Sequence, residues 1–243
     1  MSATASASAS DQAPASPPRG PERSDASPPP RSSPSTVVPP FPQRQAGLWR
    51  SALHAWNGLV HTVVHQRNMR IHLVCAILVG LVGSGIPLAL AEKVTLVFCV
   101  QLVFFAEILN AALEQLVDLA VQHFDERARL VKDSAAAGVL VLAIGTVVTF
   151  AAILVYNWPT VVSHWPEVRR QFALGVPLAL CVSLLLARWR KAAIVDGLLF
   201  VAAILLYVAT LPASESYVFS AMTFGLLFVA GAAALERRAT RPA

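Results

Sequence analysis

The sequence predicts an all-α integral membrane protein: an interfacial amphipathic helix, three transmembrane helices and then three further transmembrane helices. Of its 243 residues, 56% are hydrophobic and only 14% are charged, which is far more apolar than a soluble domain of this size. A soluble core could bury one or two such helices, but six in succession would leave no amphipathic helices to cover them. A spanning helix needs about 20 mostly apolar residues, and five stretches lack charged side chains altogether: 73–91, 134–163, 171–187, 197–214 and 216–235.

The basic residues predict the orientation in the membrane. The formal net charge is +5, but Lys and Arg lie at the ends of apolar segments rather than along one face, which argues against a nucleic-acid-binding protein. With a cytoplasmic N-terminus, 16 of the 19 Lys and Arg residues face the cytoplasm, and only Lys93, Arg169 and Arg170 lie outside. This bias predicts a multi-pass protein of the cytoplasmic (inner) membrane with both termini in the cytoplasm.

Residues 1–43 form a Pro/Ser/Ala-rich tail that we expect to be disordered. They hold 11 of the 17 prolines and ten serines, with almost no large apolar residues, so they cannot bury enough surface to offset the entropy of ordering. No apolar segment follows the start, which excludes a secretory signal, and a wrongly assigned start codon is the alternative to a translated tail.

An amphipathic helix is predicted from position 46 to position 65. Trp49 and Trp56, seven residues apart on the apolar face, favour a helix that lies in the plane of the headgroups; a soluble helix packed on another element is the alternative. The apolar face holds Trp49, Leu53, Trp56, Leu59 or Val60, and Val63, and the polar face holds Arg50, His54, Asn57, His61 and His65.

Two groups of three spans follow this helix. The first group is predicted near 71–90, 94–120 and 133–156, and Pro159 ends its last span because proline disfavours helix at the preceding residue. The second group covers 171–187, 192–211 and 217–235, and its few acids, Asp196, Glu215 and Glu236, lie near span ends as helix caps would. We interpret the three cysteines as packing residues, and the glycines of the first span as points of close helix approach.

The second span carries the polar residues that point to chemistry. At about 100° per residue, Glu107, Asn110, Glu114 and Asp118 share an arc of about 80°, so one face of a membrane helix is an acidic stripe. An ionised group at membrane depth costs at least about 2.5 kcal/mol on insertion scales, so three acids in one span indicate a functional site.

This stripe has the ligand chemistry of a Mg²⁺ site that works on phosphates. Mg²⁺ takes one or two protein carboxylates together with substrate phosphate oxygens. Lys132, Asp133, Arg127 and Arg129 follow at the same membrane face and could meet nucleotide phosphates. As alternatives, Asp133 could cap the third span and the two arginines could serve topology alone.

No P-loop and no protein-kinase catalytic loop occurs in the sequence, so ATP would have to be bound in another way. Four segments in order, spread over 50–156, resemble the bacterial diacylglycerol kinase/undecaprenol kinase family. They are Ala55-Trp56-Asn57-Gly58-Leu59, Arg67-Asn68-Met69-Arg70-Ile71-His72, the run Glu107 to Asp118 with its E-x-x-N-x-x-x-E-x-x-x-D pattern, and Lys132-Asp133 with 135–140.

The resemblance implies that 44–157 is a diacylglycerol kinase-like membrane domain of a homotrimer, using ATP and Mg²⁺. In the family the residue matching Glu107 is the proposed general base and the residue matching Glu114 is a metal ligand. The resemblance further implies that nucleotide and substrate are positioned by Asn110, Asp118, Lys132, Asp133 and Arg70. Residues 158–243 have no counterpart in the minimal family unit, so their role stays open.

Position 66 departs from the family pattern. The second metal carboxylate of the family lies two residues before the position of Asn68, where this chain has Gln66. An amide can still offer its carbonyl oxygen, but it lacks the charge that attracts a divalent cation.

The expected function is therefore transfer of the ATP γ-phosphate to a lipid alcohol, either diacylglycerol or undecaprenol. A catalytically silent family member that assembles or regulates membrane proteins is the alternative, motivated by Gln66 and the extra spans. A cation-coupled transporter would also use an intramembrane acidic face, but the sequence shows no repeats or interrupted helices of that class. His61 and His65 are four residues apart, but no third ligand accompanies them, so with His54 and His72 we interpret them as headgroup-facing residues.

Overall fold

The structure is a computed structural model that describes residues 47–187 and 193–239. The tail predicted for 1–43 and the basic segment 188–191 lie outside the described residues. Within the described part all secondary structure is helical, and no β-strand occurs. The elements are α1 (Leu48–His65), α2 (Arg67–Ser84), α3 (Leu90–Ala120), α4 (Glu126–Tyr156), α5 (Trp158–Ser163), α6 (Trp165–Leu186), α7 (Ala193–Thr210), the 3₁₀ helix η1 (Leu211–Ala213) and α8 (Tyr217–Ala239).

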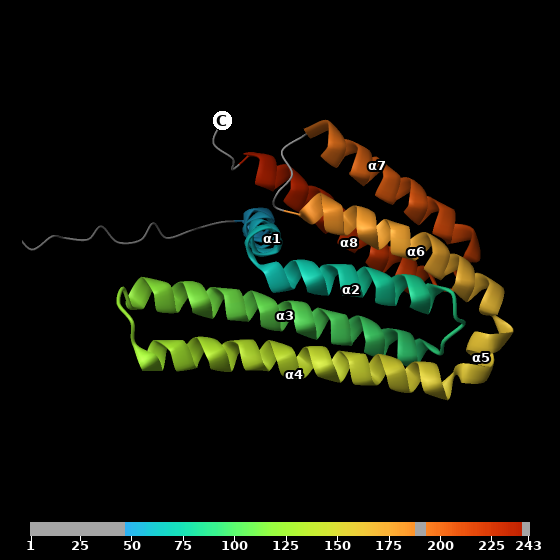
Figure 1. The fold of residues 1–243 in the computed structure, drawn as a ribbon, viewed down its shortest axis with the longest axis horizontal. Coiled ribbons are helices and arrows are strands. Elements are labelled where there is room, and N and C mark those ends of the chain that lie inside the picture. The colour runs from blue at the N-terminus through green and yellow to red at the C-terminus, as the bar shows by residue number, and fades with distance from the viewer. Residues whose placement is uncertain (1–46, 188–192, 240–243) are drawn as a thin grey trace, which may run out of the picture. The chain divides into compact units, whose positions relative to one another are not determined.

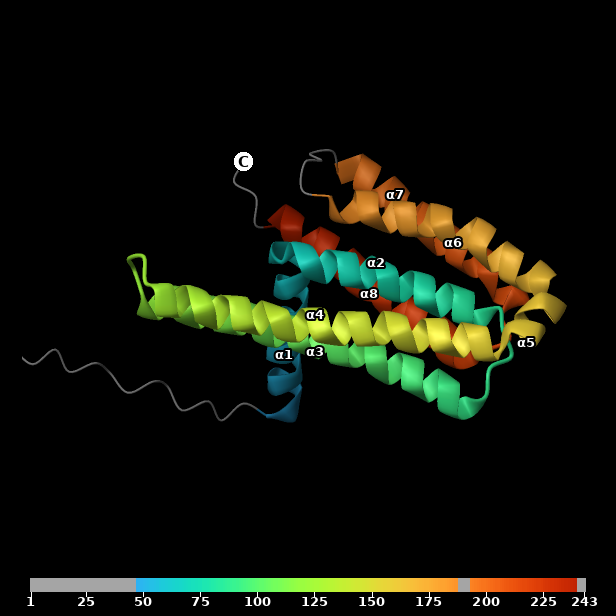
Figure 2. The same cartoon turned by 60° about the horizontal axis from the view of Figure 1, so that its bottom comes forward.

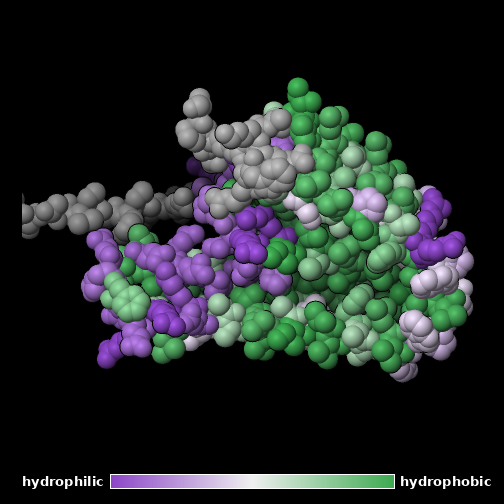
Figure 3. All heavy atoms as spheres, in the orientation of Figure 1, coloured by the Kyte–Doolittle hydropathy of each residue, from purple (hydrophilic) through white to green (hydrophobic). Residues whose placement is uncertain are grey.

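Six of these helices are long and apolar enough to cross a membrane: α2, α3, α4, α6, α7 and α8. Figure 3 shows hydrophobic side chains over the middle of the molecule and hydrophilic ones gathered at its two ends, as a bilayer requires. The predicted fold class, an all-α integral membrane protein with two groups of three spans, is therefore confirmed.

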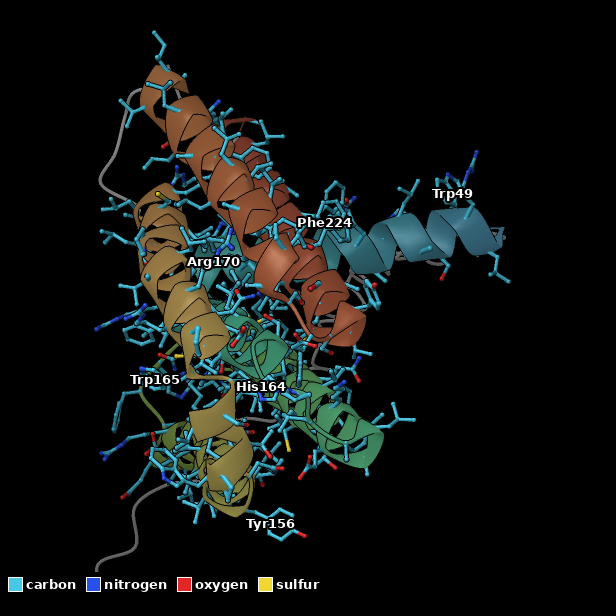
Figure 4. All side chains as sticks on the ribbon, turned by 90° about the vertical axis from the view of Figure 1, so that its right-hand side faces the viewer. Trp49, Tyr156, His164, Trp165, Arg170 and Phe224 are labelled. Atoms are coloured by element: carbon cyan, nitrogen blue, oxygen red, sulfur yellow. The ribbon has the colours of Figure 1, made fainter. Side chains whose placement is uncertain are left out.

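Helix α1 runs across the direction of the spans, as Figures 1 and 2 show from two sides. Its first turns are exposed, with Trp49 at the far tip in Figure 4 and 76% accessible. Its last turns are buried against α2 and α8, where the ring of Trp56 lies 5.3 Å from that of Phe228. An in-plane helix that is anchored at its C-terminal half fits both observations.

Helix α2 lies between the α3–α4 pair and the C-terminal group of spans. It contacts α3 on one side and both α6 and α8 on the other, while α3 pairs with α4 and α6 pairs with α7 (Figure 1). A Cβ atom on Gly80 would lie 2.5 Å from Thr223 Oγ1, and one on Gly83 would lie 2.9 Å from the ring of Phe219. These glycines therefore let α2 and α8 approach closely, as their placement in the sequence predicts.

The α3–α4 hairpin is the longest part of the fold. Each helix has 31 residues, so each is about 46 Å long, against about 30 Å for the hydrocarbon core of a bilayer. In Figures 1 and 2 the hairpin extends past the other helices at its turn. At the other end Tyr156, His164 and Trp165 surround α5 (Figure 4), and exposed aromatic rings of this kind are typical of a membrane interface.

Helix α4 begins about two turns earlier than the span predicted at 133. Asp125 is its N-cap, and the Oδ1 atom accepts from the backbone N–H groups of Arg127 at 2.7 Å and Ala128 at 3.2 Å. Asp133 lies inside the helix, so its alternative role as a cap is wrong.

Asp196 is likewise more than a cap. It is buried in the first turn of α7, and its Oδ2 atom accepts from Arg237 Nη2 at 2.9 Å and from Arg238 Nε at 3.3 Å. Both arginines come from the last turn of α8, so this cluster joins two helices of the C-terminal group. The sequence analysis missed it because the partners lie 41 and 42 residues apart.

Candidate active site

The acidic stripe of α3 runs from the buried part of the bundle to its surface. Glu107 is fully buried and Asn110 nearly so, Glu114 is half-buried, and Asp118 is exposed. Measured from Leu90 at 1.5 Å per residue, Glu107 lies about 26 Å along α3, Glu114 about 36 Å and Asp118 about 42 Å. With the start of α3 at one boundary of the hydrocarbon core, Glu107 lies just inside the opposite edge, and the other two acids lie beyond it.

Two amide side chains hold the carboxylate of Glu114. Gln66 Nε2 donates to Oε2 at 3.3 Å, and Asn110 Nδ2 donates to Oε1 at 3.1 Å. Gln66 reaches α3 because α1 ends there: the residue has extended backbone angles, φ −90° and ψ 122°, at the corner between α1 and α2. The structure thus brings together the two metal ligands that the resemblance implies, Gln66 and Glu114, from positions 48 residues apart.

This cluster fits a Mg²⁺ ion that also binds substrate. Its donors are a carboxylate and two amides, and Asn110 Oδ1 is buried without a hydrogen-bond partner among the described residues. Rotation of either amide turns a carbonyl oxygen to where its N–H group now lies. No group of three His, Cys, Asp or Glu side chains in the described ranges could hold a metal ion. The remaining ligands would therefore come from phosphate and water, as is usual for Mg²⁺.

Glu107 faces a cavity of about 240 Å³ between α2, α3 and α4. No side chain in the part of the chain that the structure describes donates to either of its carboxylate oxygens. A buried carboxylate with so few partners is costly, so the cavity is where a hydroxyl or another donor would be expected. The cavity is lined by Asn68, Ile71, His72, Glu107, Asn110, Ala136, Val139, Leu140 and Ala143.

A second, apolar cavity of about 260 Å³ adjoins the first and shares Ile71, His72 and Ala143 with it. It lies between the same three helices, and its lining is almost wholly hydrophobic. Because α4 has a single buried residue, Val139, among its 31, this face of the molecule is largely open. The two cavities together offer a polar end at Glu107 and an apolar continuation, which suits an amphipathic molecule with one hydroxyl.

The cationic residues are divided between the site and the surface. Lys132 of α4 forms an ion pair with Asp118 of α3, at the exposed end of the stripe. Asp133 instead pairs with Arg129 one turn away, at 3.5 Å, and both side chains are about two-thirds exposed. Arg70 donates from Nη1 to the carbonyl of Val64 at 2.8 Å, so it braces the corner that presents Gln66.

His72 and Asn68 are site residues that the sequence analysis did not select. They lie four residues apart on one face of α2 and line the cavity beside Glu107. The sequence did offer a signal, because Asn68 and His72 are four residues apart and follow closely after Gln66. His72 was instead grouped with the histidines of α1. Those do lie on an exposed face, where the rings of His61 and His65 stack at 4.0 Å.

Comparisons with known proteins agree with the family resemblance. Residues 53–154 match the family described as prokaryotic diacylglycerol kinase. The chain is 37% identical over 102 residues to the diacylglycerol kinase of Synechocystis sp., covering 42% of this chain and 58% of that protein. It is 31% identical over 97 residues to the undecaprenol kinase of Bacillus subtilis, covering 40% of this chain and 79% of that protein. The chain therefore spans less than two thirds of the Synechocystis relative, and no solved structure matches. The matched region holds every residue of the stripe and of the two cavities, and this chain belongs to the prokaryotic diacylglycerol kinase family.

Proposed function

We propose that this protein is a membrane lipid kinase that transfers the γ-phosphate of ATP to the hydroxyl of a lipid alcohol. The observation that carries the proposal is the position of Glu107. This fully buried carboxylate faces a cavity, and it lies between the apolar cavity and the oxygen-rich cluster around Glu114. The names of the two relatives support a lipid acceptor.

In the proposed reaction Glu107 is the general base. The lipid hydroxyl oxygen attacks the γ-phosphorus of ATP, and Glu107 accepts the hydroxyl proton as the new P–O bond forms and the bond to the β-phosphate oxygen breaks. ADP leaves and the lipid phosphate remains. The apolar walls keep water from competing with the lipid hydroxyl as acceptor.

Glu114 would hold Mg²⁺, with the carbonyl oxygens of Gln66 and Asn110 as further ligands. When bound, the ion neutralises charge on the phosphates. Lys132 extends from α4 to the same end of the stripe, where its ammonium group can exchange Asp118 for a nucleotide phosphate. Asp118, exposed beside it, is left to position the nucleotide.

The acceptor is either diacylglycerol or undecaprenol, both of which carry one hydroxyl on a long apolar body. The apolar cavity between α2, α3 and α4 would take the part of the chain next to that hydroxyl. The open side along α4 lets the rest of the lipid stay in the bilayer.

Orientation and assembly are part of the same proposal. The basic residues flanking the spans support a cytoplasmic position for the active-site end and for both termini, and ATP is found in the cytoplasm. The apolar outer face of α4 supports assembly with further copies, a homotrimer by the family resemblance. Chemical cross-linking of the protein in nanodiscs gives the subunit number directly.

The deciding experiment offers labelled ATP and Mg²⁺ to the purified full chain in mixed micelles with diacylglycerol or with undecaprenol. Transfer to one lipid identifies the acceptor. If the wild-type protein transfers label to neither lipid at any Mg²⁺ concentration, the proposal fails and the catalytically silent alternative holds.

A further inference from the structure

The cluster of Asp196, Arg237 and Arg238 leaves one carboxylate oxygen unused. Both guanidinium groups donate to Oδ2 of Asp196, at 2.9 and 3.3 Å. The Oδ1 atom is buried and has no hydrogen-bond partner among the described residues, although the side chain is only 4% accessible. An ion pair that served only to join α7 and α8 would not need this second oxygen in an enclosed position.

Asp196 lies at one end of a groove between α7 and α8. The groove has a volume of about 310 Å³, is mostly apolar and opens on the membrane-facing surface, where Phe228 and Leu235 are exposed. It is separate from the cavities at Glu107, since it shares no lining residue with them. Its lining is Leu185, Asp196, Gly197, Phe200, Phe228, Gly231, Ala232, Ala234, Leu235 and Arg238.

Arg238 places a cation at the same end of the groove. Its Nε donates to Asp196 and its Nη2 donates to the carbonyl of Ala193 at 2.8 Å. Its Nη1 makes no hydrogen bond within the described ranges, so this nitrogen can donate to an anion. An acceptor and a donor of opposite charge therefore lie side by side at the polar end of an apolar groove, near the start of α7 and the end of α8.

We propose that this groove binds a phospholipid whose headgroup carries a primary ammonium group, as phosphatidylethanolamine does. The lipid phosphate accepts from Arg238, and the ammonium group, two carbons away, donates to Asp196 Oδ1. The acyl chains follow the apolar surface of α7 and α8. This role lies outside the proposed kinase chemistry and uses none of its residues.

The carboxylate sets the choice among phospholipids. A choline headgroup has no N–H donor, so it leaves Oδ1 unpaired. A glycerol headgroup offers only neutral hydroxyl groups, which make weaker hydrogen bonds to a carboxylate than an ammonium group does. The groove should therefore select the ammonium headgroup over both.

Gly197 gives a clean way to fill the groove. A Cβ atom built on it meets nothing within 4 Å, so a larger side chain at this exposed position of α7 enters the groove without displacing the helix backbone. Gly197→Leu leaves the ion pairs of Asp196 in place, and leucine also favours helix more than glycine does. Gly225→Leu is the matched control, because Gly225 is likewise exposed with open space around its Cβ but does not line the groove.

The test measures lipid bound to the purified full chain by native mass spectrometry, with phosphatidylethanolamine, phosphatidylcholine and phosphatidylglycerol of identical acyl chains. We expect the wild type and Gly225→Leu to retain phosphatidylethanolamine at least tenfold better than the other two. Gly197→Leu should lose this preference, and so should Arg238→Gln, which keeps the Asp196–Arg237 pair.

Equal retention of the three lipids by the wild type would overturn the proposal, as would a preference for phosphatidylglycerol. An unchanged preference in a monodisperse Gly197→Leu protein would overturn it as well. If both groove variants fail to fold, the wild-type selectivity among the three headgroups decides. None of these readouts depends on kinase activity, so a failed kinase proposal leaves them interpretable.

Discussion

At the scale of single residues, Glu107 and Gln66 are the two unexpected side chains of the candidate site. Glu107 is a carboxylate where an apolar residue would be easier to bury, and Gln66 is an amide where the family resemblance predicts a carboxylate. The stripe on α3 could be predicted from sequence because helical spacing alone places its members on one face. The hydrogen bond from Gln66 to Glu114 could not, because it depends on the corner between α1 and α2.

Glu107→Gln should lower phosphoryl transfer at least 100-fold, since the amide keeps the shape of the side chain but cannot accept the hydroxyl proton. Initial rates with labelled ATP in mixed micelles measure this loss. Glu167→Gln, in the first turn of α6 away from the stripe, is the control and should keep wild-type rates. A Glu107→Gln protein with wild-type turnover would show that another group takes the proton.

Gln66→Glu should lower the Mg²⁺ concentration needed for half-maximal rate several-fold, because it adds a full negative charge beside Glu114. Without metal the same change sets two carboxylates against each other and removes the amide donor. The melting temperature in EDTA should therefore fall, and its rise on adding Mg²⁺ should exceed that of the wild type. Identical Mg²⁺ dependence of both rate and melting temperature would mean that position 66 is not a ligand.

At the scale of helices, charged residues made the start of α4 hard to predict from the sequence. The segment Glu126 to Asp133 looks like a loop because five of its eight residues are charged, yet Asp125 caps it and it belongs to the same helix as the span that follows. The spans themselves were predictable from uncharged length. Their ends were not, since polar turns of helix outside the bilayer carry no apolar signal.

Asp125→Ala should destabilise the protein by about 1 kcal/mol, because two backbone N–H groups at the start of α4 lose their acceptor. Asp133→Ala should change stability by less than about half of that, since its exposed ion pair with Arg129 contributes little. Thermal unfolding in detergent compares the two variants. Equal destabilisation would mean that Asp133 has a structural role comparable to the cap.

Lys132→Met separates a structural ion pair from a nucleotide contact. The pair with Asp118 joins α3 and α4 at an exposed site, so its loss should shift stability by less than about 1 kcal/mol. The apparent KM for ATP should nevertheless rise about tenfold, because a phosphate partner is gone. Steady-state kinetics with varied ATP test this, and an unchanged KM for ATP with a raised KM for lipid would contradict the assignment.

At the scale of the whole molecule, the contacts between the two groups of spans were beyond the sequence. Lipid tails and protein interiors are equally apolar, so hydrophobic periodicity does not tell which helix faces which. Only the glycines of α2 signalled a close approach, and the structure shows that α8 makes it. The buried ion pairs between α7 and α8 had no signal in the sequence at all.

Gly83→Leu should therefore damage the whole fold. Its side chain would collide with the ring of Phe219, which is fully buried, so α2 and α8 must separate. We expect a fall in melting temperature of at least several degrees, measured by thermal unfolding in detergent. Gly225→Leu, in open space on α8, should melt as the wild type does. A Gly83→Leu protein of unchanged stability would show that the two helices do not depend on this contact.

The excess length of the α3–α4 hairpin has a consequence for how two incompatible substrates meet. With the start of α3 at one boundary of the hydrocarbon core, Glu107 lies just inside the opposite edge, and Glu114 lies about 10 Å further along the same helix, beyond that edge. In the proposed reaction, ATP does not have to lose its hydration and enter the hydrocarbon core. The lipid, in turn, does not have to leave the hydrocarbon core to reach ATP. The new phosphate forms at the headgroup layer, which is where a charged lipid is stable. Product departure is then a sideways step within one leaflet, without any crossing between solvents.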